Sequence, residues 1–84
     1  MTRSVFLASY SVLTECLIQA RTEARLTQWD LAYALERPQS FVSKVENGER
    51  RIDLIEFLQI TTALNAEPEP IIRAVLASLA INKA

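Results

Sequence analysis

Short polar side chains gather between residues 39 and 47, and they are the part of this sequence best suited to chemistry. At 100° per residue, five of them fall within one helical arc of roughly 140°: Gln39, Ser40, Ser43, Lys44 and Asn47. The opposite side carries apolar Phe41, Val42 and Val45. Amides and hydroxyls both donate and accept hydrogen bonds, which suits base edges in a DNA major groove, and lysine can reach guanine or phosphate. The alternative interpretation is an ordinary solvated surface helix.

Composition excludes several other kinds of chemistry. The chain contains no histidine and a single cysteine, Cys16, so a Cys/His zinc site, histidine-based catalysis and an intramolecular disulfide are excluded. It also has no glycine-rich phosphate loop and no clustered carboxylates, so we expect no enzymatic activity, no metal and no cofactor. Cys16 lies on an apolar stripe and is predicted to be a small buried hydrophobe.

Charge and length narrow the possible classes of protein further. Nine basic and ten acidic residues leave a net charge of -1, which is typical of neither a disordered acidic tail nor an unselective nucleic-acid coat. With 84 residues the chain should form one small domain, residues 1–84. The apolar run near the N-terminus is interrupted early by Ser9, Tyr10 and Ser11, and no run approaches the roughly 18 residues of a membrane span. We therefore expect a cytoplasmic protein without membrane association.

Start and stop signals predict five helices that would position the polar arc, and hence an all-α fold. The first covers roughly residues 9–24, and the second begins at Thr27 with a capping-box pattern and ends near residue 35 or 36, before Pro38. The third starts with Pro38 as its first residue and stops at Asn47-Gly48. The fourth opens with a capping box at Asp53 and ends at Asn65, and the fifth covers about residues 71–81.

The neighbourhood of the polar arc resembles a known family. Residues 26–48 read Leu-Thr-Gln-Trp-Asp-Leu-Ala-Tyr-Ala-Leu-Glu-Arg-Pro-Gln-Ser-Phe-Val-Ser-Lys-Val-Glu-Asn-Gly. This segment is similar to the helix-turn-helix of phage repressor and Cro-type (XRE family) transcriptional regulators, and the resemblance covers about residues 10–66. It implies a compact five-helix bundle of the phage-repressor DNA-binding domain type, with the helix-turn-helix at about residues 27–47.

The resemblance also implies a role for individual side chains. Base contacts fall on Gln39, Ser40, Ser43 and Lys44. Phosphate contacts fall on Thr27, Gln28, Asn47, Arg50 and Arg51, and Gln28 also braces the recognition helix. Arg21 and Glu46 match a structural ion pair between the first and third helices.

Four positions depart from the family pattern. Glu36 and Arg25 stand where glycine is common, so either a non-glycine residue takes a left-handed conformation or the turns differ. Pro38 replaces a serine cap, and Glu49 lies where a basic residue would help to bind phosphate. Glu49 and the net charge predict modest nonspecific DNA affinity for a monomer.

The fifth predicted helix is apolar nearly all round, which indicates that it is either sandwiched or shared with a second copy. In the resembling family a helix at this position commonly forms the dimer contact, so we expect a homodimer joined by about residues 70–81. The expected interface residues are Ile72, Val75, Leu76 and Leu79. The alternative is that Val5-Phe6-Leu7 cover this helix within one chain. Trp29 and Tyr33, four residues apart on the second helix, are expected to form a partly buried pair or a rim near the DNA backbone, in preference to stacking on bases.

The sequence therefore predicts a sequence-specific regulator of transcription, a dimeric repressor or autoregulator that binds a double-stranded DNA operator. The alternative is the DNA-binding antitoxin of a toxin–antitoxin pair, in which the apolar C-terminal helix or the N-terminal arm would hold a toxin protein.

Overall fold

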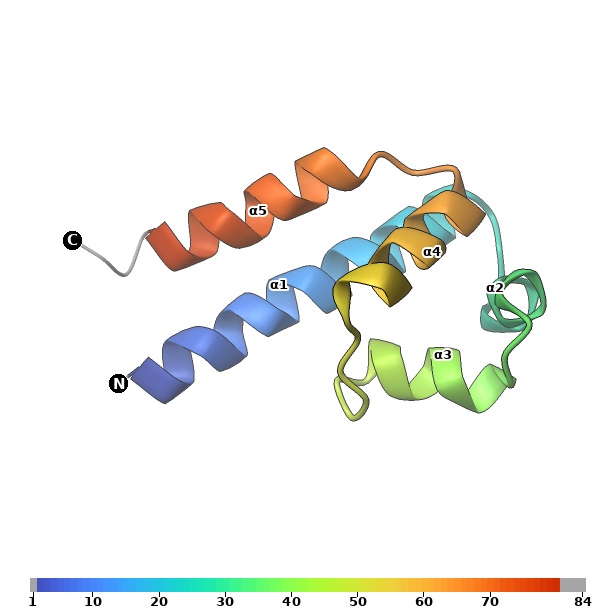
Figure 1. Ribbon diagram of the computed structural model, residues 1–84, viewed down its shortest axis with the longest axis horizontal. Helices are drawn as coiled ribbons and strands as arrows, with labels where there is room; N and C mark the ends of the chain where they lie inside the picture. Colours follow the sequence, from blue (N-terminus) through green and yellow to red (C-terminus); the bar gives the residue numbers. More distant parts are fainter. Residues whose placement is uncertain (1, 81–84) are drawn as a thin grey trace.

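A computed structural model describes residues 2–80 of the chain, and its side chains from Ala8 to Ala80. This part of the chain forms five helices: α1 (Thr2–Glu23), α2 (Gln28–Leu35), α3 (Gln39–Glu46), α4 (Leu54–Leu64) and α5 (Pro68–Ala80). The predicted all-α class is confirmed. Figure 1 shows α5 running antiparallel to α1, while α2, α3 and α4 are grouped around the C-terminal part of α1. Within residues 2–80 no helix has the length and apolar character that crossing a membrane requires.

Two helices begin with the capping boxes that the sequence predicts. The Thr27 hydroxyl accepts a hydrogen bond from the backbone N–H of Asp30 at 3.1 Å, and the Asp30 carboxylate accepts one from the N–H of Thr27 at 2.8 Å. At the start of α4, Asp53 and Glu56 make the same reciprocal exchange at 2.7 and 3.0 Å. Each box satisfies N–H groups that the first helical turn leaves without partners.

Four helices are followed, within two residues of their last, by a residue in the left-handed region, and three of these residues are not glycine. The φ angles are 62° at Arg25, 57° at Glu36, 79° at Gly48 and 55° at Asn65. At Glu36 the backbone N–H bonds to the carbonyl of Tyr33 at 3.1 Å, and the next N–H bonds to that of Ala32 at 3.0 Å. The sequence predicted this cap at Asn65, and it left open whether Glu36 would adopt it. Glu36 does.

Three predicted boundaries are wrong. Helix α1 begins at Thr2, well before the expected start near residue 9. Ser9 is buried inside α1 and accepts a hydrogen bond from the Ser78 hydroxyl of α5 at 2.9 Å, so it joins the two helices. Pro38 is the extended residue before α3, with ψ of 152°. Helix α5 starts at Pro68, because proline is tolerated in a first turn, and its expected end at Ile81 lies outside the described residues.

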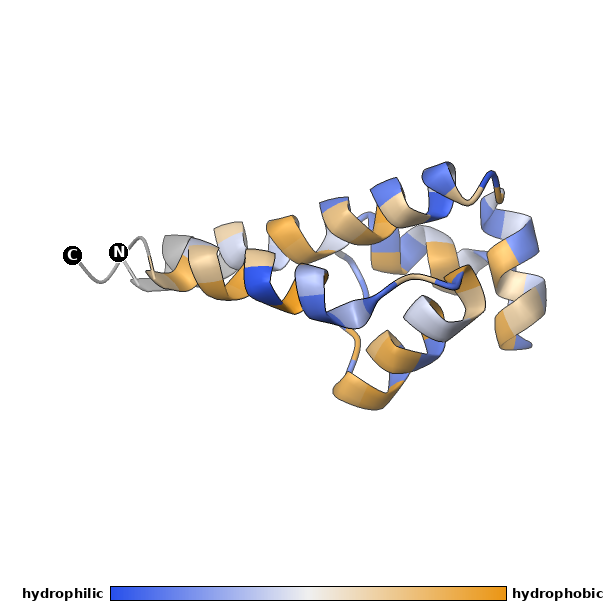
Figure 2. Cartoon of the chain, turned by 90° about the horizontal axis from the view of Figure 1, so that it is seen from above, coloured by the Kyte–Doolittle hydropathy of each residue, from blue (hydrophilic) through white to orange (hydrophobic). Residues whose placement is uncertain are grey.

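The core forms where α1, α2, α3 and α4 meet, and the first turns of α5 add Ile71 to it. Its buried apolar residues are Leu17, Leu31, Ala32, Val42, Val45, Phe57, Ile60, Leu64 and Ile71. Val42 and Val45 point from α3 into this core, so the opposite face of α3 is turned away from it. Cys16 was expected to be buried but is half-buried at the edge of the core. Figure 2 shows apolar positions along much of α5.

Candidate nucleic-acid interface

Helix α3 presents the predicted polar arc on one accessible face. Ser40, Lys44 and Asn47 are exposed, while Gln39 and Ser43 are half-buried. This orientation follows from Val42 and Val45, because a helix that buries these two positions must turn residues 39, 40, 43, 44 and 47 outward. Tertiary packing therefore brings all five predicted residues onto the same surface.

A chain of hydrogen bonds links the start of α3 to α1. Arg21 of α1 donates from Nε to Glu46 Oε2 at 2.7 Å and from Nη2 to Glu46 Oε1 at 3.1 Å. Gln28 donates from Nε2 to Glu46 Oε1 at 2.8 Å, and Gln39 donates from Nε2 to Gln28 Oε1 at 2.7 Å. The ion-paired side chains are only 13% and 7% exposed, for Arg21 and Glu46 respectively. The four residues form one relay from α1 to the first residue of α3.

The relay determines which way the two amides point. A carboxylate can only accept, so Gln28 must turn its NH₂ group toward Glu46 and its carbonyl oxygen toward Gln39. Gln39 must then use one of its two N–H groups on Gln28. Its second N–H and its carbonyl oxygen remain as a donor–acceptor pair at the edge of the exposed face of α3.

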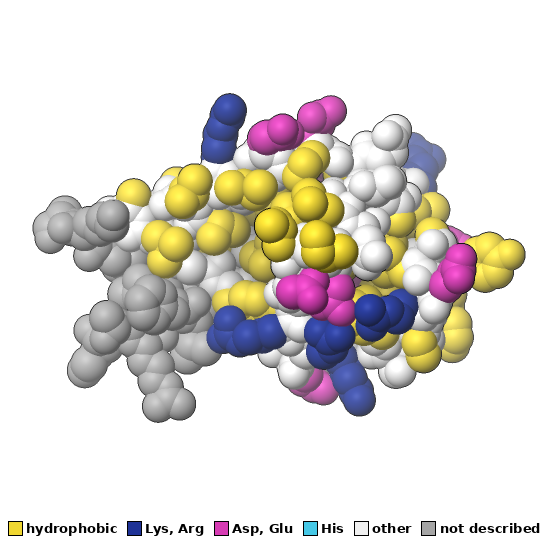
Figure 3. Space-filling view, in the orientation of Figure 1, with side chains coloured by type: hydrophobic (Ala, Val, Ile, Leu, Met, Phe, Trp, Pro, Cys, Tyr) yellow, Lys and Arg dark blue, Asp and Glu magenta, His cyan; other side chains and the backbone are white. Residues whose placement is uncertain are grey.

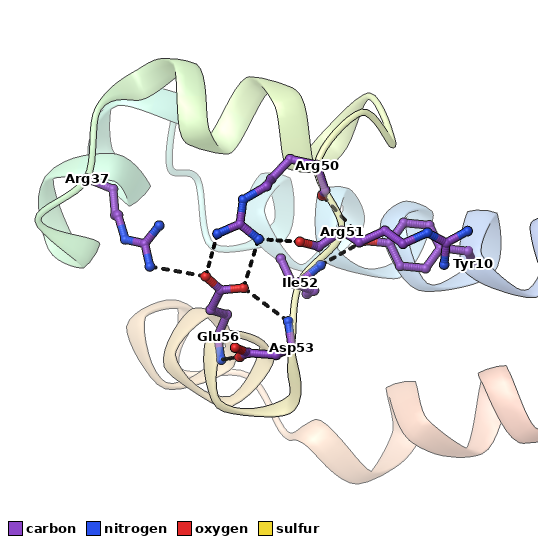
Figure 4. Close-up of polar contacts among 7 residues, drawn as sticks. All are labelled: Tyr10, Arg37, Arg50, Arg51, Ile52, Asp53 and Glu56. Carbon is purple, nitrogen blue, oxygen red and sulfur yellow. Dashed lines mark hydrogen bonds and ion pairs between the residues drawn. The ribbon is translucent and has the colours of Figure 1, made fainter.

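The loop after α3 carries two of the predicted phosphate ligands, Arg50 and Arg51, and their side chains have different partners. Arg50 donates to both carboxylate oxygens of Glu56, at 3.1 and 2.8 Å, and its guanidinium also contacts the carbonyl of Arg51. Arg51 instead lies over the ring of Tyr10, with 4.4 Å from its guanidinium carbon to the ring centroid. Figure 4 shows Arg50 directed at Glu56, and Arg51 extended along Tyr10 of α1. Arg50 thus has an internal partner that the sequence did not predict.

The Glu56 carboxylate, at the start of α4, binds two arginines. Arg37, from the turn before α3, donates to Glu56 Oε2 at 3.1 Å, and the guanidinium groups of Arg37 and Arg50 lie 4.2 and 5.2 Å from the centroid of the Phe41 ring. Hydrogen bonds from Arg50, from the Asp53 backbone N–H and from Arg37 lower the pKa of Glu56 from 4.5 to about 2. Figure 3 shows the resulting surface, in which basic groups alternate with acidic ones below an apolar patch.

Sequence reasoning missed Tyr10, Arg37 and Glu56 as part of this surface. The sequence indicated Tyr10 only as a residue that interrupts the N-terminal apolar run, and Glu56 only as the partner of Asp53 in the predicted capping box. The sequence offered no direct signal for this group, because Arg37 and Arg50 are brought to Glu56 by the packing of α4 against the turn before α3 and the loop after it.

The remaining predicted positions are also placed by the structure. Thr27 is exposed at the start of α2, where its hydroxyl serves the capping box. Trp29 and Tyr33 are 70% and 88% exposed, so the expectation of a partly buried pair is wrong: their neighbours in α2, Leu31 and Ala32, take the buried positions. Among the described residues no group of three or more His, Cys, Asp or Glu side chains could hold a metal ion.

Solved structures resemble this fold closely. An XRE-family like protein from Pseudomonas syringae pv. tomato str. DC3000 is 42% identical, over 90% of this chain and 93% of that chain, with a TM-score of 0.85. The chain belongs to the XRE family of helix-turn-helix DNA-binding transcriptional regulators. The restriction-modification controller protein C.AhdI from Aeromonas hydrophila is 33% identical over 76% of this XRE-family chain and 97% of its own, with a TM-score of 0.69.

A more distant neighbour shares the XRE-family fold. The restriction-modification controller protein C.Esp1396I, solved as a tetramer in complex with its natural 35 base-pair operator, is 19% identical over 86% of this chain and 95% of that chain, with a TM-score of 0.72. The chain matches no protein-family model and no curated protein.

Proposed function

We propose that this XRE-family protein is a sequence-specific regulator of transcription, which binds a double-stranded operator as a homodimer and acts as a repressor or an autoregulator. Helix α3 enters the major groove and reads base edges with Gln39, Ser40, Ser43 and Lys44. Thr27, Gln28, Asn47 and the loop after α3 contact the flanking phosphates. The XRE-family fold and the polar face of α3 support this assignment.

The observation that carries the proposal is the relay from Arg21 to Gln39. It leaves Gln39 with one free N–H and one free carbonyl oxygen on the exposed side of α3. Adenine offers N7 as an acceptor and N6–H as a donor in the major groove, and a glutamine amide satisfies both. Because Glu46 fixes the amide orientation through Gln28, Gln39 is prepared for adenine before DNA arrives.

The proposed dimer rests on an apolar surface that continues from α4 onto α5. Its exposed members are Leu54, Ile55, Leu58, Ile72 and Leu76. Val75 and Leu79 are half-buried, so of the four interface residues expected from sequence, Ile72 and Leu76 are the more accessible. A groove lined by Leu13, Leu54, Ile72 and Leu76, among others, runs between the two helices. A second copy of the chain would cover this surface and double the number of phosphate contacts.

Selection from a randomised duplex library would identify the operator and test the proposal. We expect an inverted repeat, and we expect Gln39→Ala to weaken operator binding by about 1–3 kcal/mol and to relax the preference at one base pair in each half-site. Gln59→Ala is the matched control, because Gln59 is an exposed glutamine on α4, outside the polar face. An unchanged base preference in Gln39→Ala would contradict the role given to Gln39, and a library without enriched sequences would contradict sequence-specific binding.

A further inference from the structure

We propose that the loop between α3 and α4 is assembled before DNA binds, with Arg51 as its phosphate ligand, Arg50 as an internal brace, and Tyr10 and Glu56 as positioning residues. This inference rests on the proposed function, since it concerns how the same surface meets the DNA backbone. It assigns different roles to two adjacent arginines that the sequence treats alike.

Arg50 is held on the protein side. Its guanidinium makes two hydrogen bonds to the Glu56 carboxylate and a further one to the carbonyl of Arg51. The Glu56 side chain is 11% exposed, and its hydrogen bonds also reach Arg37 and the Asp53 N–H. Three of the five N–H donors of Arg50 are thus occupied, and the Glu56 carboxylate already balances its charge. We therefore expect Arg50 to add little to phosphate binding, although its side chain is 41% exposed.

Arg51 has the opposite environment. It is exposed, and among the residues with described side chains it forms no ion pair. Its guanidinium lies over the Tyr10 ring, a contact that uses the flat face of the group and leaves its in-plane N–H donors available. A phosphate approaching Arg51 therefore meets a full positive charge whose orientation is already restricted.

Tyr10 also ties the backbone on both sides of Arg51. Its hydroxyl accepts a hydrogen bond from the Ile52 N–H at 3.2 Å and donates to the Arg50 carbonyl at 3.5 Å. A residue of α1 thus sets both the course of the loop and the direction of the Arg51 side chain, as Figure 4 shows. Restricting a ligand group in its bound geometry reduces the entropy lost on binding.

Salt dependence separates the two arginines. We would measure binding of a fluorescein-labelled mixed-sequence duplex across a series of KCl concentrations for the wild type, Arg50→Met and Arg51→Met. Loss of one phosphate contact lowers the slope of log affinity against log salt by about 0.9. We expect Arg51→Met to reduce the slope by about that amount for each copy bound, whereas Arg50→Met leaves the slope at the wild-type value. Equal reductions in the two variants would overturn the division of roles.

A double-mutant cycle tests the positioning role of Tyr10. We expect Tyr10→Leu to weaken DNA binding in the wild-type background and to have little further effect in the Arg51→Met background, since the group it positions is then absent. Additive losses would show that Tyr10 supports only the fold. Tyr10→Phe keeps the ring but removes the hydroxyl, so it should leave most of the salt slope and expose the Ile52 amide to faster hydrogen exchange.

The two levels of the proposal fail differently. If the wild type binds no duplex at any salt concentration, the proposed function falls and the assignment of Arg51 falls with it. If the wild type binds but the two arginine variants behave alike, or the Ile52 amide exchanges equally fast in wild type and Tyr10→Phe, only the inference about the loop is wrong.

Discussion

Two carboxylates with little exposed surface, Glu46 and Glu56, organise the polar groups on either side of α3. Glu46 joins Arg21 to Gln28 and, through it, to Gln39. Glu56 joins Arg37 to Arg50 and caps α4. Each carboxylate places an acidic group close to the proposed DNA surface, and in each case arginine neutralises the charge. Removing either carboxylate should therefore show how much the chain loses when the paired arginines keep their charge without it.

For Glu46 we expect the loss to appear in the free energy of unfolding. We expect Glu46→Leu to lower the free energy of unfolding by about 3 kcal/mol, because Arg21 would keep a largely buried charge without its carboxylate. Urea denaturation at a fixed protein concentration measures the loss. The double variant Arg21→Met with Glu46→Leu is the control. It should recover most of the stability, and a double variant that is less stable than Glu46→Leu alone would contradict the explanation.

For Glu56 we expect the loss to appear in how the stability of the folded chain changes with pH. Its pKa is lowered from 4.5 to about 2 in the folded chain, because Arg50, the Asp53 N–H and Arg37 donate to its ionised form. The unfolded chain therefore binds the proton more readily than the folded chain. The resulting stabilisation is complete above pH 4.5 and is lost as the pH falls from 4.5 toward 2. Urea midpoints measured across this range should decline more steeply for the wild type than for Glu56→Gln, and parallel declines would contradict this assignment.

At the level of elements, the helix ends determine how α2 and α3 meet. The turn between them is made by Glu36 in the left-handed region and by extended Pro38, so the angle of the helix-turn-helix is achieved without glycine. A left-handed conformation costs an ordinary L-residue roughly 1–2 kcal/mol, which Gly48 avoids at the end of α3. At Glu36 the local capping hydrogen bonds to Tyr33 and Ala32 offset part of this cost.

Replacing the strained residue should stabilise the chain. We expect Glu36→Gly to raise the free energy of unfolding by about 0.5–1 kcal/mol, with Glu36→Ala as the control that removes the side chain but keeps the strain. Gly48→Ala should have the opposite effect and destabilise by about 1 kcal/mol. The space around Gly48 is open, so its cost would come from the backbone alone. Thermal unfolding of the three variants tests the set, and a Glu36→Gly variant no more stable than Glu36→Ala would argue against strain at this turn.

At the level of the whole molecule, the apolar surface of α4 and α5 lies beside the loop that carries Arg51. Figure 3 shows this surface immediately above the basic groups on the same face of the molecule. Two copies that pair through it would bring their α3–α4 loops near a common axis. Their recognition helices should then lie roughly 34 Å apart, one turn of the DNA helix.

A charge within this surface should prevent pairing. Leu76 is 58% exposed in the single chain, and we expect Leu76→Glu to shift sedimentation equilibrium strongly toward the monomer, because each dimer would bury an unpaired carboxylate. Leu76→Ala is the milder control. Leu76→Glu should also bind a full operator no better than an isolated half-site. Wild-type protein that remains monomeric at high micromolar concentration would contradict the proposed dimer.

Much of the fold could be predicted from sequence because its signals act over a few residues. The capping boxes at Thr27 and Asp53 join residues three positions apart, and the left-handed cap at Asn65 is equally local. The polar and apolar faces of α3 follow from helical periodicity in the same way. The start of α1 was missed because its first residues offer several serines but no decisive cap.

Contacts between residues far apart in the chain were decided by the tertiary structure. Tyr10 meets the Ile52 N–H across 42 positions, and Arg37 meets Glu56 across 19. Sequence spacing cannot show which arginine of the pair Arg50 and Arg51 finds a carboxylate, because this depends on how α4 packs beside the loop. By itself, the sequence determined the helices and the face of α3 that points outward. The packing of α1 and α4 around that helix decided which charges are neutralised and which remain available to DNA.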